Sequence, residues 1–269
     1  MGSTSDYMME SEEEARRLDL KTVPGTVQKH AQWAGIRSGM RVADLGCGSG
    51  KTSYYLNKLV QPNGETVGVD NAKQRIDFAT STYQDDDLSF IQGDIREDLS
   101  KLGQFDFIWI RFVLEYYRLE SFDIVKNIVN ILKPGGILCL ADLDYNCLTH
   151  FGLPNRLESA VTGMMKMVEK KANFDPYVGR KLYAYLYDLG FQDLDVHLAP
   201  HHLIFGDLKP VDAFNWTLKV QSRRVREAYA FDQYEGGYEE FFKEFKQAFE
   251  DPRRFTYTPI ILCRGKKAA

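Results

Sequence analysis

The chain has 269 residues, 44% of them hydrophobic and 27% charged, which suits one globular α/β domain with insertions. Its formal net charge of −4 leaves no basic field for nucleic acid or membrane surfaces, so a small or neutral partner is expected. No run reaches the roughly 18 apolar residues that span a bilayer, the acidic N-terminus is unlike a signal peptide, and the cysteines form no CxxC or Cys/His pairing. We therefore expect a cytoplasmic protein with no membrane insertion and no metal.

The first expected elements are two helices. Ser11 and Glu14 form a capping box that predicts a helix running towards Leu20, and a second helix is expected over 24–34. From Met40 onwards, short apolar runs alternate with helical stretches, which is typical of a parallel sheet with crossover helices. The expected strands are 41–44, 66–70, 88–92, 105–110 and 137–141, and the helices between them are 52–60, 73–83 and 122–132.

The second half of the chain is expected to be mainly helical. The segment 133–136, Lys-Pro-Gly-Gly, should end the third crossover helix, since Pro cannot continue a helix and Gly turns the chain. After Asp144 two helices, a strand, a mostly helical stretch and a final strand are expected, at 153–172, 177–190, 191–205, 207–250 and 256–264. The predicted fold class is α/β, a doubly wound sheet of seven strands, mostly parallel, with a C-terminal antiparallel strand pair and helical cap insertions.

A glycine-rich turn follows the first expected strand, in the sequence VADLGCGSG at 42–50. Its three alternating glycines permit a tight turn and let a ligand touch the backbone; they are Gly46, Gly48 and Gly50. A dinucleotide fold would need a further glycine where Lys51 stands, and the strand ends in Asp44, which suits a ligand amine better than a phosphate. Cys47 inside the turn is expected to be a buried small residue rather than a nucleophile.

Two more acids end the next two strands. Asp70, followed by Asn71, ends the second strand, where a carboxylate can accept two hydrogen bonds from ribose hydroxyls. The third strand leads through Gln92 and Gly93 into Asp94. Because ligands of open α/β sheets bind at the carboxyl ends of the strands, the three acids should line one crevice.

With these motifs in this order, residues 40–144 resemble the class I S-adenosylmethionine-dependent methyltransferases, and within them the quinone-biosynthesis-like small-molecule group. The segments 105–111 and 132–136 also look like later motifs of that family. The resemblance implies a Rossmann-like fold and S-adenosyl-L-methionine as cofactor. It implies that the segment from Asp44 to Gly50 wraps the methionine part, that the acid at Asp70 holds the ribose, and that Asp94 with Ile95 contacts adenine.

The domain division follows from the same resemblance. We expect an N-terminal helical cap at 1–38 and a methyltransferase domain at 39–269, with cap insertions at 145–190 and 207–252. The aromatic residues of the second insertion would suit a lid over an apolar or aromatic acceptor, although most of them must serve packing.

The sequence names no decisive general base. Positioning and desolvation would supply most of the rate, and a base would help where the acceptor is a hydroxyl or an acidic carbon. Asp142, Asp144 and His150 are candidates because they follow the fifth strand, although each is also explained as a solvated loop residue. His201 and His202 are expected further from the edge, as satisfied or exposed histidines.

Arg111 ends the fourth strand, where the family keeps methyl donor and acceptor together. It either binds the cofactor carboxylate or an anionic substrate, or it forms an ion pair with Glu115 or Asp142. The sequence leaves these readings open.

The predicted function is transfer of a methyl group to an oxygen, carbon or nitrogen of a small, apolar or aromatic acceptor. The fourth strand lacks the Asn/Asp-Pro-Pro-Tyr type motif of amino-directed nucleic-acid methyltransferases. A protein methyltransferase and a non-catalytic S-adenosylmethionine-binding protein remain as alternatives, the latter because no base is evident. A nicotinamide-dependent oxidoreductase is disfavoured by the missing glycine.

Overall fold

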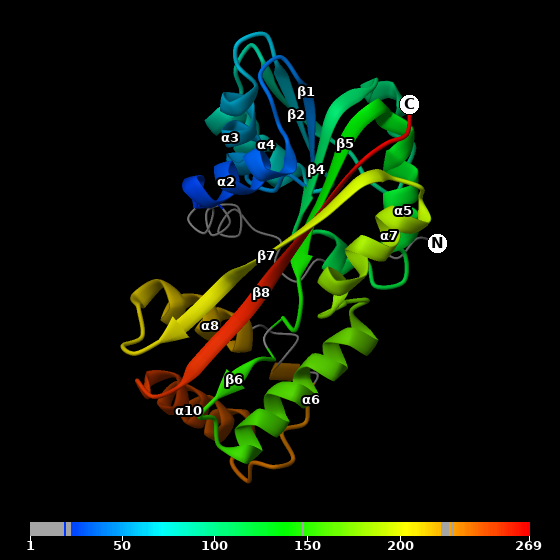
Figure 1. The fold of residues 1–269 in the computed structure, drawn as a ribbon. Coiled ribbons are helices and arrows are strands. Elements are labelled where there is room, and N and C mark those ends of the chain that lie inside the picture. The colour runs from blue at the N-terminus through cyan, green and yellow to red at the C-terminus, as the bar shows by residue number, and fades with distance from the viewer. Residues whose placement is uncertain (1–18, 20–22, 147, 222–225, 228) are drawn as a thin grey trace.

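The chain folds into a doubly wound α/β sheet from which a long hairpin extends, as the computed structural model shows (Figure 1). The structure describes residues 19, 23–146, 148–221, 226–227 and 229–269, so most of the helix expected from Ser11 lies outside the described residues. The strands are β1 (Arg41–Leu45), β2 (Glu65–Asp70), β3 (Leu88–Gln92), β4 (Phe105–Arg111), β5 (Leu132–Leu143), β6 (His150–Phe151), β7 (Gln192–Phe205) and β8 (Phe255–Lys266). The α-helices are α2 (Pro24–Ala34), α3 (Lys51–Val60), α4 (Lys73–Tyr83), α5 (Ser121–Ile128), α6 (Asn155–Lys171), α7 (Leu182–Asp188), α8 (Pro210–Gln221) and α10 (Gly237–Glu250), and the 3₁₀ turns are η1 (Ser100–Leu102), η2 (Leu114–Tyr116), η3 (Val129–Ile131) and η4 (Val178–Lys181).

The sheet confirms the predicted fold class. Five parallel strands run in the order β3-β2-β1-β4-β5, β8 pairs antiparallel with β5, and β7 pairs antiparallel with β8. The sheet has eight strands rather than the expected seven, because the two-residue β6 pairs with the far end of β8 at His150↔Thr256. Two residues carry no periodic pattern, so this strand exists only because β8 runs past β5 and offers it a partner.

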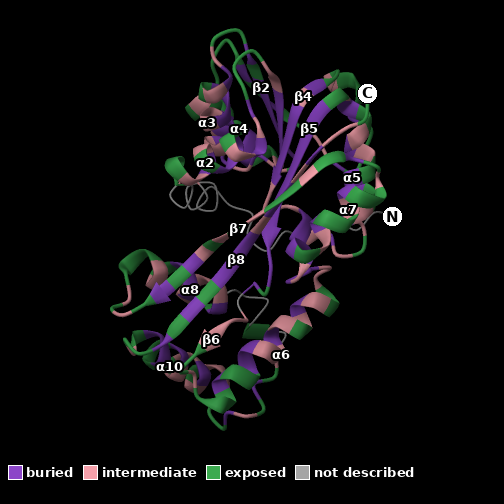
Figure 2. Cartoon of the chain, in the orientation of Figure 1, coloured by how far each residue is buried: buried purple, intermediate pink, exposed green. Residues whose placement is uncertain are grey.

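Helices cover both faces of the sheet (Figure 1). On one face α2 and α3 bury side chains such as Ala31 and Leu56 against Trp109 of β4. On the other face α5 and α7 pack against Ile108 and the neighbouring strands, with Leu182 fully buried. The inner strands β1, β2, β4 and β5 are mostly buried (Figure 2), as expected for a parallel sheet covered on both sides, whereas the edge strand β3 is largely exposed.

The segment 133–136 departs from the expectation that it ends a helix. Helix α5 ends at Ile128, a 3₁₀ turn follows, and Leu132 already pairs with Phe105 in the parallel sheet. The next pair is Phe107↔Ile137, so the Lys-Pro-Gly-Gly segment bulges out within β5. Pro lacks an N–H for the ladder and Gly135 takes a left-handed φ of 74°, which explains why the chain bulges there.

The hairpin of β7 and β8 extends beyond the sheet and carries α8 and α10 at its far end, where α6 packs against α10 (Figure 1). There a second apolar cluster forms, which we call the distal cluster. Its buried members are Leu157, Ala160, Val161, Met164, Ile204, Trp216, Val220, Phe231, Tyr234, Phe241, Phe245, Ala248 and Phe249. Within the expected insertion 145–190, α6 belongs to the distal cluster. Helix α7 belongs instead to the main core, the apolar cluster that the sheet forms with α5 and α7. The domain division itself stays a prediction. Among the described residues, no helix is long and apolar enough to cross a membrane.

Candidate functional site

The glycine turn after β1 adopts the left-handed backbone that its sequence predicts. Gly46, Gly48 and Gly50 have φ angles of 81°, 56° and 83°. The N–H groups of Gly46 and Cys47 donate to the carbonyl of Val69, at 2.7 and 3.0 Å. A Cβ atom on Gly46 would lie 2.3 Å from a methyl group of Val113, so a larger residue does not fit there. The turn is therefore held tightly between the ends of β1, β2 and β4.

Asp44 lies buried under this turn. Its Oδ2 accepts a hydrogen bond of 2.6 Å from the hydroxyl of Ser53 on α3. Burial raises the pKa of the Asp44 carboxyl to about 7, although the Ser53 hydrogen bond and the charge of Arg111 act in the opposite direction. A buried carboxyl of this kind gains most from a cationic ligand group, which would restore its ionised form. The sequence analysis did not predict a role for Ser53. It is the third residue of α3, and its side chain reaches back to the end of β1.

Asp70 is bound from both sides. Its Oδ2 accepts the N–H of Gly48 at 2.9 Å, while its Oδ1 accepts the N–H of Ala72 at 3.0 Å. The buried guanidinium of Arg75 adds two contacts to Oδ1, at 2.9 and 2.8 Å, and a third to Oδ1 of Asn71 at 3.0 Å. Oδ1 of Asp70 is therefore saturated, and Oδ2 keeps room for a ligand hydroxyl. Arg75 was not singled out by the sequence, although a basic residue one helical turn after the acid was a usable signal.

Asp94 lies at the same edge but is more exposed. It forms an ion pair with Arg96 and accepts that residue's N–H at 2.9 Å, and these hydrogen bonds lower the pKa of its carboxyl. Burial raises the pKa of the Tyr117 phenol, and the negative charges of Asp94 and Asp70 raise it further. The edge thus brings the acids of β2 and β3 together, while the side chain of Ile95 is buried in the main core.

Arg111 ends β4 near Asp44 and Asp142. Among the described residues it makes no hydrogen bond or ion pair, and its enclosed Nε has no acceptor. Of the two alternatives that the sequence left open, the ion pair with Glu115 or Asp142 is absent among the described residues. Burial lowers the pKa of Arg111 to about 10, and the carboxylates of Asp44 and Asp142 act in the opposite direction.

The three candidate bases lie in different environments. Asp142 is fully buried, accepts the N–H groups of Glu115 and Leu143, and has its pKa raised well above the usual range by burial and by the charge of Glu115. Both carboxylate oxygens of Asp144 are bound by Arg180, at 2.8 and 2.9 Å. His150 lies at the distal cluster, where its ring contacts the rings of Trp216 and Phe249.

A comparison with protein families identifies the fold. A family model described as a methyltransferase domain matches residues 36–188, more than half of the chain. The chain belongs to this family, the class I S-adenosylmethionine-dependent methyltransferases. This membership confirms the predicted enzyme class and the predicted cofactor, S-adenosylmethionine.

Curated relatives and solved structures match the chain in part or in whole. Demethylmenaquinone methyltransferase of Staphylococcus aureus (strain Newman) is 30% identical over 108 residues, covering 39% of this chain and 44% of that protein. The Lactococcus lactis protein of the same name is 27% identical over 110 residues, covering 39% and 43%. The chain thus matches less than half the length of these relatives. A cyclopropane-fatty-acyl-phospholipid synthase-like protein from Lactobacillus casei shares the fold, with a TM-score of 0.60, 13% identity, and coverage of 94% of this chain and 92% of that one.

Two further features concern Asp19 and the search for metal ligands. Asp19 ahead of α2 accepts a hydrogen bond of 2.7 Å at its carbonyl from Lys51, which directly follows the glycine turn, and its carboxylate contacts Tyr83. No group of three or more His, Cys, Asp or Glu suited to a metal occurs among the described residues. Asp19 therefore lies close to the glycine turn and to α4.

Proposed function

We propose that this methyltransferase moves a methyl group from S-adenosylmethionine to an oxygen, carbon or nitrogen of a small, apolar or aromatic acceptor. The observation that carries the proposal is the left-handed glycine turn tied through the Gly48 N–H to the carboxylate of Asp70. When bound, the cofactor supplies an activated methyl group on its sulfonium. The residues of the chain then have to bind, orient and exclude water.

The cofactor contacts that we assign follow from the chemistry of each group. Asp44 takes the ammonium, because a buried carboxyl with a pKa near 7 gains from a cation. Asp70 takes a ribose hydroxyl at Oδ2, and Asn71 lies beside it. The turn residues wrap the methionine part, with the adenine next to the third strand end and Arg111 where cofactor and acceptor meet. The residues assigned to the cofactor are Asp44, Gly46, Cys47, Gly48, Gly50, Asp70, Asn71, Asp94 and Ile95, and Arg111 serves either the cofactor carboxylate or an anionic acceptor.

Cys47 acts in this set through its backbone. Burial raises the pKa of its thiol well above the usual range, and the carboxylates of Asp70 and Asp44 add to this effect. A thiol that stays protonated is a poor nucleophile, which supports a packing role for the side chain.

A small acceptor is supported by the names of the curated relatives, which concern a demethylmenaquinone. The net charge of −4 supports an acceptor other than nucleic acid. We also propose a cytoplasmic location, on the cysteine pattern of the sequence.

A second candidate is a protein that binds the cofactor without turning it over. Three observations among the described residues favour it: Asp142 is fully buried, Asp144 is bound by Arg180, and His150 lies at the distal cluster. Such a protein would bind S-adenosylmethionine and never consume it with any acceptor. A screen of phenols, quinols and amines for product formation separates the two candidates.

The test is calorimetric titration of S-adenosylmethionine and S-adenosylhomocysteine into the wild type and Asp70→Asn, with NAD as the ligand control. The affinity for both sulfur ligands should fall at least about tenfold, since a hydrogen bond to a charged group contributes roughly 1.5–3 kcal/mol. Asp77→Asn, an exposed carboxylate paired with Lys73, is the matched control and should bind as the wild type does. Binding of NAD alone would overturn the proposal.

A further inference from the structure

Arg111, at the carboxyl end of β4, is a cation with no counter-ion within the part of the chain that the structure describes. Among the described residues neither Asp44 nor Asp142 lies within ion-pair distance, although both act on it electrostatically. Its guanidinium carbon lies 4.1 Å from the centre of the Phe112 ring. A partly buried arginine in this state carries a desolvation cost that an anionic ligand would offset.

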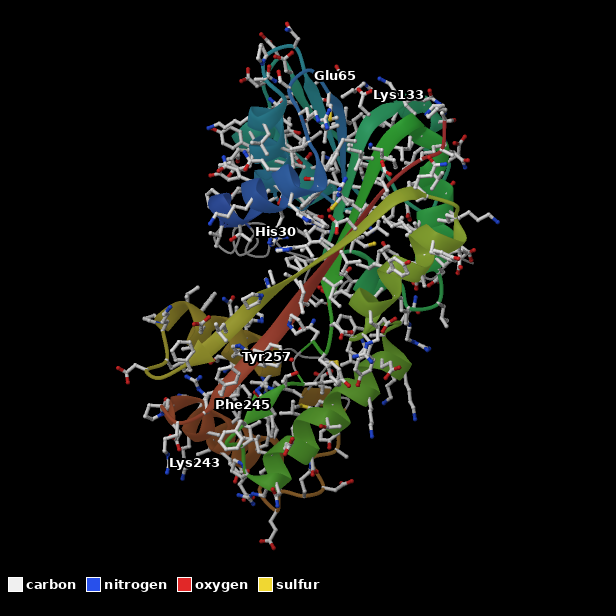
Figure 3. All side chains as sticks on the ribbon, viewed as in Figure 1. His30, Glu65, Lys133, Lys243, Phe245 and Tyr257 are labelled. Carbon is white, nitrogen blue, oxygen red and sulfur yellow. The ribbon has the colours of Figure 1, made fainter. Side chains whose placement is uncertain are left out.

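A neutral histidine is near enough to Arg111 to feel its charge. His30 of α2 is only 6% exposed, and its Nδ1 has no hydrogen-bond partner among the described residues. Figure 3 shows it between α2 and β7. Burial, with the charges of Arg111 and His197, lowers the pKa of His30 to about 4. Its imidazole is therefore uncharged at neutral pH and offers a hydrogen bond without adding a second charge. The ring of His197 on β7 lies 5.7 Å from that of His30, and Trp33 packs against His197 at 5.4 Å.

Aromatic rings also lie next to Arg111. Phe112 has a left-handed φ of 59°, unusual for a residue with a bulky side chain, and its N–H donates to the carbonyl of Ala141 at 3.0 Å. This backbone directs its ring onto that of His201, at 4.7 Å. The register of β7 against β8 shifts between Pro200 and His202, and this irregularity brings the rings of His201 and His202 to 4.3 Å. Strained backbone and bulges of this kind gather at functional sites, where they aim a side chain.

We propose that Arg111, flanked by His30 and by the Phe112–His201 ring pair, binds an ionised oxygen on an aromatic acceptor such as a phenol or a quinol. This inference rests on the proposed function and adds the acceptor class to it. The guanidinium favours the anion, and the rings of Phe112, just after β4, and His201, on β7, match a planar ligand. The acceptor loses its proton to solvent before transfer, so the site needs no side-chain base.

The cofactor carboxylate is the competing source of the same chemistry. The acceptor is favoured because the groups around Arg111 come from α2 and β7, which lie outside the glycine turn, and β7 continues into the distal hairpin. The carboxylates that face this group are Asp44 on β1 and Asp142 on β5.

The experiment compares the wild-type chain with Arg111→Met by calorimetry, using S-adenosylhomocysteine and 5′-methylthioadenosine, which lacks the amino-acid part. It then titrates 4-nitrophenol, whose ionised form absorbs visible light, into protein saturated with S-adenosylhomocysteine. Both nucleosides should bind the variant within about twofold of the wild type. The loaded wild type should raise the ionised fraction of 4-nitrophenol at constant pH, and the variant should lose its affinity about tenfold or more, as for truncation of one partner of a buried charge pair.

Two further variants keep the result interpretable. Arg111→Lys keeps the charge and should retain part of the 4-nitrophenol binding even if Arg111→Met folds poorly by circular dichroism. Arg253→Met removes a charge from a side chain that is 88% exposed and should change nothing. Loss of S-adenosylhomocysteine affinity with unchanged methylthioadenosine affinity would assign Arg111 to the cofactor and overturn the inference. Equal 4-nitrophenol binding by wild type and Arg111→Met would also overturn it. If the wild type bound neither S-adenosylhomocysteine nor 5′-methylthioadenosine, the proposed function itself would be contradicted.

Discussion

The cofactor edge, formed by the glycine turn with Asp44 and Asp70, differs from the distal cluster in how it is held together. At the cofactor edge, backbone N–H groups and short-range partners dominate, as between Ser53 and Asp44, nine residues apart. At the distal cluster, side chains from remote segments meet, as where Arg156 of α6 pairs with Glu240 and Glu244, more than 80 residues away. The first region depends on backbone shape and the second on side-chain volume. The cofactor edge therefore tolerates little change, whereas the distal cluster can be repacked.

The largest expected effect is on stability in the distal cluster. Phe245 is 2% exposed there, and Phe245→Ala should lower the free energy of unfolding by about 3–5 kcal/mol, because it leaves a cavity among packed rings. Urea unfolding measures this, and calorimetry should show unchanged affinity for S-adenosylhomocysteine. Phe214→Ala, at a 55% exposed position, is the matched control and should stay within about 0.5 kcal/mol. A parallel loss of cofactor affinity would show that the two regions form one energetic unit.

The corresponding change at the cofactor edge is Gly46→Ala. The left-handed φ and the overlap with Val113 should together cost about 2–4 kcal/mol, and the displaced turn should weaken S-adenosylhomocysteine binding at least tenfold. Gly25→Ala is the control, since a Cβ atom there meets nothing within 4 Å, and it should stabilise the chain by roughly 0.4–1 kcal/mol. If Gly46→Ala bound S-adenosylhomocysteine as the wild type does, the cofactor edge would not depend on backbone shape, and its contrast with the distal cluster would be lost.

The two regions also differ in how far the sequence predicted them. The strands β1 to β4 were placed within a residue at each end, because apolar runs and turn residues are local signals. The contacts that were missed depend on tertiary geometry. Arg75 binds Asp70 only because the turn from β2 into α4 aims it back, and His201 reaches Phe112 only because β7 changes register. Strict strand alternation would have placed His201 and His202 on opposite faces.

A smaller effect should appear in the pH dependence of the cofactor edge. The pKa of Asp44 is raised from 3.8 to about 7 in the fold, so the native state holds a proton that the unfolded state has released. Its contribution to stability is therefore lost as pH rises through that window, at about 1.4 kcal/mol per pH unit. His30, with its pKa lowered to about 4, contributes the opposite slope, so the quantity to measure is the difference between wild type and Asp44→Asn.

Urea unfolding at about pH 5, 6 and 7 provides that difference. Relative to Asp44→Asn, the wild type should lose stability with rising pH, and binding of S-adenosylhomocysteine below pH 7 should release a proton from the wild type alone. Parallel stability curves for the two proteins would mean that Asp44 is already ionised in the fold and that its ligand does not need to be a cation.

The smallest effect concerns His150, which the sequence offered as a base and which the structure puts at the distal cluster. Its Nδ1 lies 2.9 Å from the hydroxyl of Thr256, its partner in the β6–β8 pairing. Thr256 is 1% exposed, so Thr256→Val keeps the shape, removes one hydrogen bond and should cost about 1 kcal/mol of unfolding free energy. Because this pair ties β6 to the far end of β8, the loss should leave S-adenosylhomocysteine and 4-nitrophenol binding unchanged. If 4-nitrophenol binding fell with Thr256→Val, the acceptor would lie at the distal cluster, and His150 would regain its claim to act on it.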